Sequence, residues 1–553
     1  MSVSTAVRDF FRPSAWVVEP EPSSYAPNSK WSNRDMDPTP PYLRTWGKWS
    51  YVAYWISGSF NISAWEVASS MLAVGLSWRQ ALASIAIGHS IISIPILFNG
   101  LIGARLHIPF PVLVRSSFGF WFSYFAVVSR VILSMFWFGI QVGVKCVYQM
   151  LKAIWPSIQR LPNRLPESAH VTTANMICFF LYMVIQMPFM ILSPQKVKWF
   201  FWFKALVSPP ACIAMLIWAF VKVPGTPPAA SESLGNKHAS LSGDSFHWGY
   251  MGALNSAIGI WLTLAVNVAD FTRYAKSEQA TLVQAAIIPP VFTFIGFVGI
   301  VVTATGEVLY GKTLWDPTTL IDLWDNRAAA FFASFAFAVG TIGTNISANS
   351  LSAATDLTVL FPRYINIRRG QILCAIIGGW AFVPWEVSSS PIQGFLNFMS
   401  GYTIFLSPFA AMYAPHPSFW LVHRGKVSVA AMYDPKGAYR YMGGFNWHCV
   451  VALLISVSPG IPGLANAVNP SINVGKALHI YQMSALYGFF AAMAVYYTLS
   501  MLFPDKKTFF LERPVIRCDI EAPTEDEHAS YDEAEKKWDE EKGQTTVDVQ
   551  PVH

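Results

Sequence analysis

Long apolar runs separated by short polar segments dominate this sequence. A membrane-spanning helix needs roughly 20 predominantly apolar residues, and twelve segments of the chain reach that length. The pattern predicts an all-α polytopic membrane protein with about twelve transmembrane helices. The expected spans are 50–75, 79–104, 119–150, 171–193, 200–222, 250–273, 280–310, 328–360, 371–389, 392–415, 447–467 and 479–503.

Two of these spans are interrupted by small and polar residues. The first contains Gly58-Ser59-Phe60-Asn61-Ile62-Ser63, and the sixth contains Leu254-Asn255-Ser256-Ala257-Ile258-Gly259-Ile260-Trp261. Broken helices at matching places in two five-helix halves are typical of inverted-repeat transporters, which bind their substrate at the breaks. Small residues that only let helices pack closely are the alternative. The five-span separation favours the transporter.

The third span carries Trp137 and Gln141, which a continuous helix would place on one face, one turn apart. An indole offers a flat stacking surface, and a glutamine amide offers a donor beside an acceptor. Together they suit a small flat ring with amide-like edges, such as a nucleobase. A packing tryptophan next to a glutamine bonded to a neighbouring helix is the alternative interpretation.

Polar groups are also concentrated in the eighth span, where Asn345 and Asn349 lie one turn apart in a run of small residues from Gly340 to Ser350. Amides in hydrocarbon are costly unless they are paired, so this face is expected to border protein or a wet cavity. Helix–helix hydrogen bonding is the alternative, but the number of polar groups exceeds what packing needs.

Few charges lie within the spans. Glu66, about one turn beyond the first break, is a candidate proton carrier, with a structural pair to a residue such as Lys145 as the alternative. Asp270 and Arg273 close the sixth span and are expected to form an ion pair at its cytoplasmic end, as part of a gate.

Composition agrees with a membrane location. Only 13% of the 553 residues are charged, against roughly a quarter in soluble proteins. The net charge of +6 and the lack of a basic patch with interleaved aromatics argue against nucleic acid. Six cysteines without CxxC spacing indicate free thiols and no metal site. The sequence contains no HExxH or GxSxG motif, so we expect no enzyme and no cofactor.

Loop charges predict the topology. Loops on the N-terminal side hold more lysine and arginine than the opposite loops, and they include Arg105, Arg115, Lys204 and Arg369. The positive-inside rule then places both termini in the cytoplasm. The N-terminus has no apolar run of the signal-peptide type.

Both tails are polar. Residues 1–48 are expected to be mostly disordered. The acidic tail 504–553 carries Lys536, Lys537 and Lys542, which are candidate ubiquitin acceptors if the tail is a cytoplasmic endocytosis signal read by ubiquitin ligase machinery. A merely solvated acidic tail is the alternative.

Several long motifs occur in order from about Trp31 to Phe503. They are DMDPTPPYLRTWG, YWISGSFNISAWEVASSMLAVGLSWRQ, HIPFPVLVRSSFG, SRVILSMFWFGIQ, VADFTRYAK, GTNISANSLSAATDLTVLFPRYINIRRG and MYDPKGAYRYMGGFNW. With them the chain resembles the nucleobase–cation symporter-1 family, in particular its fungal uracil/allantoin permease-like branch. The resemblance implies a LeuT-like five-plus-five inverted repeat with two additional helices and cation-driven uptake of heterocycles by alternating access.

The resemblance also implies roles for individual residues. The family's stacking tryptophan and amide-binding glutamine fall on Trp137 and Gln141, and its eighth-span asparagine falls on Asn349, with Asn345 shaping the site. By similarity to a structurally known bacterial hydantoin permease, Trp261 would cover the other face of the ring.

For the coupling cation, the resemblance points to the first and eighth spans. The aligned residues are Ser59, Ile62, Gly340, Gly343 and Thr344. Gly343 stands where the bacterial relative has a serine, and a hard cation that loses an oxygen ligand binds more weakly. This departure favours a proton over sodium. The tenth-span residues Phe395 and Met399 align with the family's outer gate.

These observations together predict a plasma-membrane, proton-coupled importer of allantoin, uracil or a close heterocycle. Other rings (uric acid, cytosine or purine, a nucleoside, thiamine) and a non-transporting receptor are the alternatives. The expected division is a cytoplasmic tail 1–48, five-helix repeats 49–222 and 223–415, a loop with the last two helices 416–503, and a cytoplasmic tail 504–553.

Overall fold

A computed structural model describes residues 16–18, 30–192, 194–224, 241–382, 392–413, 427–505 and 508. Regular structure in this part of the chain is helical, with two isolated β-bridges, Trp46–Ala275 and Met442–Phe445. Eight of its helical segments are long and apolar enough to cross a membrane, judged by length and composition. These are Trp78–Leu106, Ser123–Ile154, Glu167–Met190, Val197–Lys222, Glu278–Tyr310, Arg327–Leu360, Trp447–Val468 and Ser484–Leu502.

Helices also occupy the described parts of all the remaining predicted spans. The first five ranges contain α2 (Lys48–Ser59), α3 (Ile62–Ala73), α4 (Trp78–Leu106), α7 (Ser123–Ile140), α8 (Val144–Ile154), α9 (Thr173–Met190) and α10 (Pro194–Lys222). Short helices α5 (Phe110–Leu113) and α6 (Arg115–Phe118) join α4 to α7.

The described part of the second half of the chain is helical as well. Its helices are α12 (Gly243–Gly259), α13 (Leu262–Asn267), α14 (Ala269–Thr272), α15 (Val283–Tyr310), α16 (Pro317–Ile321), α17 (Arg327–Thr344), η7 (Asn345–Ser350), α18 (Leu351–Leu360), α19 (Ile367–Ile376), η8 (Ile377–Ala381) and α21 (Ile392–Tyr413). After these come α22 (Val429–Tyr433), α23 (Trp447–Val457), α24 (Ile461–Val468), α25 (Ala477–Gln482) and α26 (Ser484–Leu502).

Both predicted helix breaks are confirmed. The first lies at Phe60 and Asn61, and the Asn61 side chain caps α3 by accepting the Ala64 N–H at 2.9 Å. The sixth span is broken at Ile260 and Trp261. There the Gly259 carbonyl accepts a hydrogen bond from the Tyr402 hydroxyl at 2.7 Å. Side chains therefore satisfy backbone groups that each interruption leaves unpaired.

The third span is not the continuous helix that the sequence predicts. Helix α7 ends at Ile140 and α8 begins at Val144, so Gln141 lies in a break. A Cβ added at Gly143 would lie 2.7 Å from Tyr182 Cε2, so glycine is needed where the break approaches α9. Gln141 still donates its backbone N–H to the Trp137 carbonyl at 2.9 Å, which keeps the two residues close.

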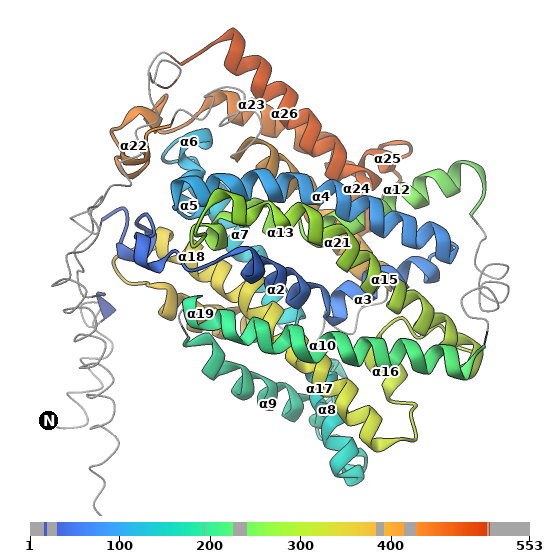
Figure 1. The fold of residues 1–553 in the computed structure, drawn as a ribbon. Coiled ribbons are helices and arrows are strands. Elements are labelled where there is room, and N and C mark those ends of the chain that lie inside the picture. The colour runs from blue at the N-terminus through green and yellow to red at the C-terminus, as the bar shows by residue number, and fades with distance from the viewer. Residues whose placement is uncertain are drawn as a thin grey trace, which may run out of the picture.

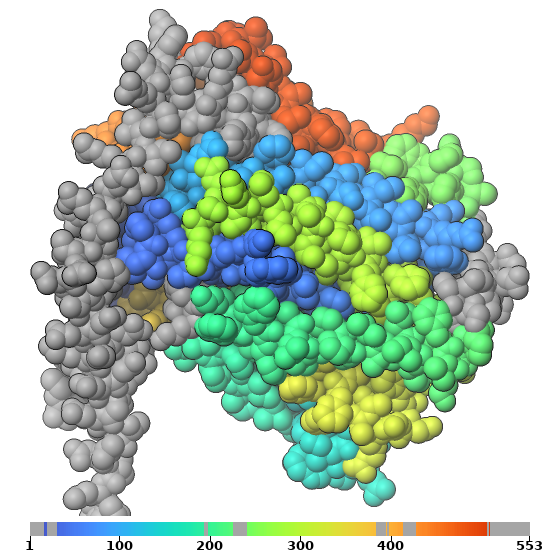
Figure 2. All heavy atoms as spheres, in the orientation of Figure 1, coloured from blue at the N-terminus to red at the C-terminus, as the bar shows by residue number. Residues whose placement is uncertain are grey.

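The broken first span lies at the centre of the molecule. Helix α2 packs against both α10 and α15, and in the ribbon and space-filling views it forms a narrow band between its neighbours (Figures 1 and 2). Helix α21 packs against α26, and α26 against α23, on the side of the molecule away from α8 and α9 (Figure 1). The breaks are therefore enclosed by surrounding helices, as broken helices in a membrane protein must be.

Residues 30–47 are ordered, which corrects the expectation of a disordered tail up to residue 48. Met36 and Trp46 are buried. The Asp35 carboxylate accepts the Ile367 N–H at 2.8 Å, and the Trp46 N–H donates to the Tyr274 carbonyl at 2.9 Å. Burial of these apolar side chains offsets the entropy of ordering the segment. We call the side where this segment lies the N-terminal side.

Other predictions fall partly outside the described residues. The acidic tail with Lys536, Lys537 and Lys542 lies outside them, as do Cys518 and the side chain of Phe395. The five described cysteines are buried and free, as predicted.

Candidate functional site

Four of the five predicted substrate-binding residues meet in one small pocket at the centre of the fold. Trp137 comes from α7, Gln141 from the break after it, Trp261 from the break between α12 and α13, and Asn349 from η7. The space that they enclose with neighbouring side chains measures about 20 Å³. It is too small for a heterocycle, so a substrate must widen it to bind.

The amides in this pocket are bonded to one another. Asn349 donates to Gln141 Oε1 at 2.9 Å and to Asn345 Oδ1 at 2.8 Å. Gln141 in turn donates to the Ser63 hydroxyl at 3.4 Å. A bound ring with amide edges could exchange these bonds for its own without leaving a polar group unpaired, which is the basis of amide selectivity.

Asn345 lies behind Asn349 rather than on the wall of the pocket. It is fully buried and donates to the Phe138 carbonyl at 3.1 Å and to Gln186 Oε1 at 3.2 Å. The π-helical turn of η7 brings Asn345 and Asn349 within hydrogen-bonding distance. Sequence analysis missed Gln186, a polar residue inside an apolar span, which fixes the orientation of this chain of amides.

Trp261 is held by other aromatic rings. Its ring centroid lies 4.9 Å from that of Phe292 and 5.6 Å from that of Trp55. A Cβ added at Gly58 would lie 3.4 Å from Trp261 Cη2, so the first break packs directly on the indole. Trp261 Nε1 is buried without a hydrogen-bond partner among the described residues, which leaves it available to a ligand.

Two tenth-span residues that the sequence analysis did not name contact Trp137. Phe398 and Tyr402 of α21 contact Trp137, with ring centroids 5.4 Å and 6.2 Å away. Met399 is fully buried and contacts the Tyr402 hydroxyl through its sulfur at 3.5 Å. Phe398 therefore connects Trp137 of the pocket with a neighbouring, larger cavity that it also lines.

The cation region contains a lysine that the sequence analysis assigned to a loop. Lys204 lies in α10, is fully buried, and donates from Nζ to Thr344 Oγ1 at 2.6 Å. A Cβ added at Gly343 would lie 2.7 Å from Lys204 Cδ. Glycine at position 343 therefore makes room for the lysine, which explains the absence of the serine hydroxyl expected for a sodium ligand.

The other residues predicted to bind the coupling cation do not form one site, because some border the first helix break and others line a separate cavity. A Cβ added at Gly340 would lie 2.6 Å from the Phe60 carbonyl, so Gly340 and Thr344 border the first break. The Ser59 hydroxyl donates to the Ile56 carbonyl at 2.9 Å, within its own helix. Ile62 and Glu66, by contrast, line a separate cavity.

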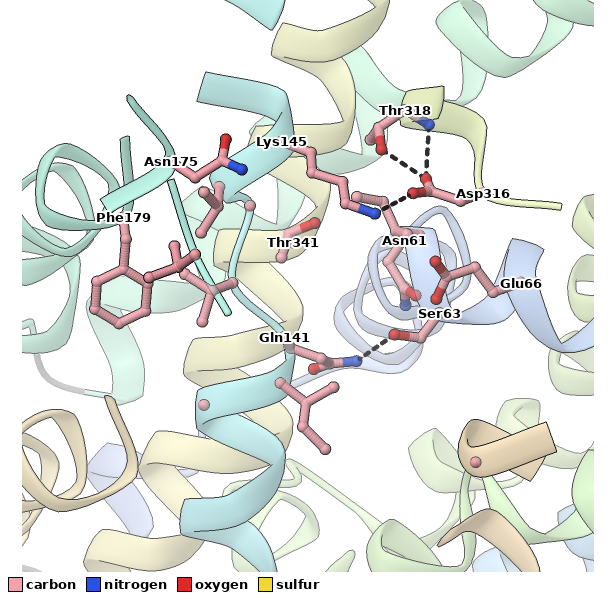
Figure 3. A pocket seen from close by; sticks show the side chains of 18 of the residues that line it. Asn61, Ser63, Glu66, Gln141, Lys145, Asn175, Phe179, Asp316, Thr318 and Thr341 are labelled. Atoms are coloured by element: carbon pink, nitrogen blue, oxygen red, sulfur yellow. Dashed lines mark hydrogen bonds and ion pairs between the residues drawn. The ribbon is translucent and has the colours of Figure 1, made fainter. Parts of the chain in front are cut away.

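This cavity, which we call the vestibule, has a volume of about 440 Å³. Figure 3 shows the side chains of Glu66, Gln141 and Lys145 around it. Lys145 forms an ion pair with Asp316 at 2.7 Å rather than with Glu66. Although burial raises the pKa of Asp316, the Lys145 ammonium and the hydrogen bonds from Thr318 hold that pKa below its ordinary value.

On the N-terminal side, the structure replaces the expected Asp270–Arg273 pair with a different cluster. Arg130 contacts the Asp356 carboxylate closely and lies 4.0 Å from Asp270, and all three residues are buried. Arg273 instead donates to the Asp35 carbonyl at 2.8 Å. Asp270 is therefore turned toward the interior, while Arg273 binds the N-terminal segment.

The chain is similar to known permeases. Residues 38–488 match a family described as permeases for cytosine/purines, uracil, thiamine and allantoin. An uncharacterized permease of Schizosaccharomyces pombe is 37% identical, over 87% of this chain and 85% of that protein. The allantoin permease of Saccharomyces cerevisiae is 34% identical, over 85% of this chain and 76% of that protein.

Among solved structures, the chain is similar to Mhp1, a nucleobase-cation-symport-1 family transporter in a closed conformation with bromovinylhydantoin bound. The TM-score is 0.61 at 22% sequence identity, over 86% of this chain and 97% of Mhp1. This likeness confirms the predicted LeuT-like helical fold.

Proposed function

Because this chain belongs to the family of permeases for cytosine/purines, uracil, thiamine and allantoin, we propose that it is a proton-coupled importer of a small heterocycle, allantoin or uracil above all. It is a multi-pass membrane transporter and not an enzyme. In the proposal, repeats 49–222 and 223–415 alternate access to the central pocket.

The substrate proposal is supported by the walls of the pocket. Trp137 and Trp261 offer two indole faces for a flat ring, and Gln141 and Asn349 offer donors and acceptors for its edges. The similarity to an allantoin permease points to the same class of ligand. Asn345 and Gln186 hold Asn349 in place.

The buried amine of Lys204 is the observation that carries the coupling proposal. Burying a charge without a partner costs several kcal/mol, and the described residues give Lys204 a hydroxyl but no carboxylate. A buried lysine changes its protonation readily with its surroundings. Lys204 also donates a hydrogen bond to the Thr344 hydroxyl, which is one of the oxygens that the resemblance assigns to the cation region. Proton release from Lys204 on inward opening would couple substrate import to the proton gradient.

Labelled uracil and allantoin, supplied to cells that lack their own carriers, test this proposal. We expect saturable uptake of one of them that is stronger at acidic than at neutral pH and indifferent to sodium. Lys204→Met should abolish the pH dependence, whereas Lys198→Met, on the same helix, should preserve it. Sodium-dependent uptake would contradict proton coupling, and uptake of uridine or thiamine alone would contradict the substrate class.

Location and orientation belong to the same proposal. We place the protein in the plasma membrane with both termini in the cytoplasm, so that the vestibule opens to the outside and the segment 30–47 lies inside. The excess of lysine and arginine in the loops on the N-terminal side supports this orientation. Antibody access to an epitope tag at each terminus in intact cells would test it.

A further inference from the structure

The vestibule and the central pocket are separate spaces, and we propose that the vestibule is a second binding site for the same heterocycle. This inference rests on the proposed function, because it takes its ligand class from there. The central pocket encloses about 20 Å³, whereas the vestibule measures about 440 Å³. The vestibule falls within the range of roughly 300–1,000 Å³ typical of small-molecule sites.

An acidic and a basic side chain both line the vestibule. Glu66 comes from α3 and Lys145 from α8, and Lys145 forms its ion pair with Asp316 rather than with Glu66. The Glu66 carboxylate has no hydrogen-bond or ion-pair partner among the described side chains, and Figure 3 shows it beside the cavity. It is therefore an acceptor that a ligand N–H can use.

Lys145 supplies the complementary donors. Its ammonium carries three N–H groups, and its ion pair with Asp316 at 2.7 Å fixes its position. Asp316 is anchored in turn by the Thr318 hydroxyl at 2.6 Å. A ligand with an N–H beside a carbonyl, as in an imide or ureide, can donate to Glu66 and accept from Lys145.

Apolar side chains form the floor of this site. Phe398 borders the vestibule, and its ring centroid lies 5.4 Å from that of Trp137 in the central pocket. Gln141 borders both spaces. A ring resting on Phe398 would thus lie next to a side chain that packs on Trp137, and movement of Phe398 would admit it to Trp137 and Gln141.

Equilibrium binding of tritiated uracil and tritiated allantoin to the purified full-length protein in lipid nanodiscs tests the proposal. We expect two molecules per chain for the wild type. Asn349→Ala, in the central pocket, should leave one molecule bound, and so should Glu66→Ala, in the vestibule. Glu167→Ala, which alters an exposed carboxylate outside both spaces, should keep both. Glu66→Ala should raise the KM for uptake about tenfold.

Different results separate the two proposals. One molecule per chain, lost in Asn349→Ala and unaffected by Glu66→Ala, would overturn the second site and leave the proposed function standing. No binding of either probe would overturn the proposed function and the second site with it.

A chemical measurement covers the case in which Glu66→Ala does not fold. Asn175→Cys places a thiol at a partly exposed position on the vestibule wall, while the native described cysteines are buried. In the Asn349→Ala background, uracil or allantoin should slow labelling of this thiol by a membrane-impermeant reagent. Labelling at an unchanged rate would overturn the second site.

Discussion

Charged residues are used differently on the two sides of the central pocket. On the vestibule side, Lys145 pairs with Asp316 while more than half of the lysine side chain stays exposed (56%). On the N-terminal side, Arg130 is fully buried between Asp356 and Asp270. The first arrangement leaves an open cavity, and the second joins α7, α14 and α18 into a closed layer. The structure is therefore accessible from the vestibule side and sealed on the other.

The buried cluster should show the largest effect of substitution. Arg130→Met leaves Asp356 and Asp270 buried without their cation, which costs about 3–5 kcal/mol. We expect a large loss of folded protein, measured by size-exclusion chromatography of detergent-solubilised, fluorescently tagged protein. Arg130→Met combined with Asp356→Asn should recover part of it. Unchanged yield of the single variant would contradict a stabilising role for the cluster.

The second largest effect should be a loss of folding stability in acid, which arises at His107 on the N-terminal side. Burial lowers the pKa of His107 to about 4, against the opposing hydrogen bond to the Arg273 carbonyl. Because the unfolded histidine takes up a proton near pH 6.5 and the folded one does not, stability falls as the pH drops from about 6.5 to 4. The loss is on the order of 3 kcal/mol, and the melting temperatures of wild type and His107→Gln should diverge as the pH drops over this range. Parallel curves would contradict this assignment.

In the central pocket, Asn349→Ala should weaken transport without unfolding the protein. The variant loses hydrogen bonds to the substrate and leaves Gln141 Oε1 without its donor, which costs about 1–3 kcal/mol. We expect the KM for uptake to rise roughly 5- to 150-fold. Asn326→Ala, which removes only a helix cap at the start of α17, provides the control. An unchanged KM for Asn349→Ala would place the substrate elsewhere.

A surface pair on the vestibule side should show the smallest effect. Lys152 contacts Asp322 at 2.6 Å, with both side chains partly exposed. Such pairs contribute about 0–1 kcal/mol, so Lys152→Met should change the melting temperature and the uptake rate little. A loss comparable to that of Arg130→Met would remove the contrast between the two sides.

Sequence alone was sufficient for features that depend on local pattern. The length of the apolar runs located the helices, and clusters of small residues located the first and sixth breaks. The pocket residues Trp137, Gln141 and Asn349 could be named because their side-chain chemistry is distinctive and because the motifs around them resemble a family.

Features that depend on contacts between distant segments could not be predicted. The third break requires Gly143 to meet Tyr182 on another helix. Lys204 near a span end looks like a loop charge until Gly343 is seen to make room for it. Sequence proximity suggests an ion pair between Asp270 and Arg273, but the fold brings Arg130 of α7 close to Asp270 instead.

Proton movement measured together with substrate movement tests the central claim most directly. In proteoliposomes that contain a pH-sensitive dye, uracil or allantoin added outside should acidify the interior when the wild-type protein is present. Lys204→Met should bind the substrate yet produce no acidification, whereas Lys198→Met should behave like the wild type. Acidification of equal rate and extent with Lys204→Met would contradict the assignment of Lys204 as the coupling group.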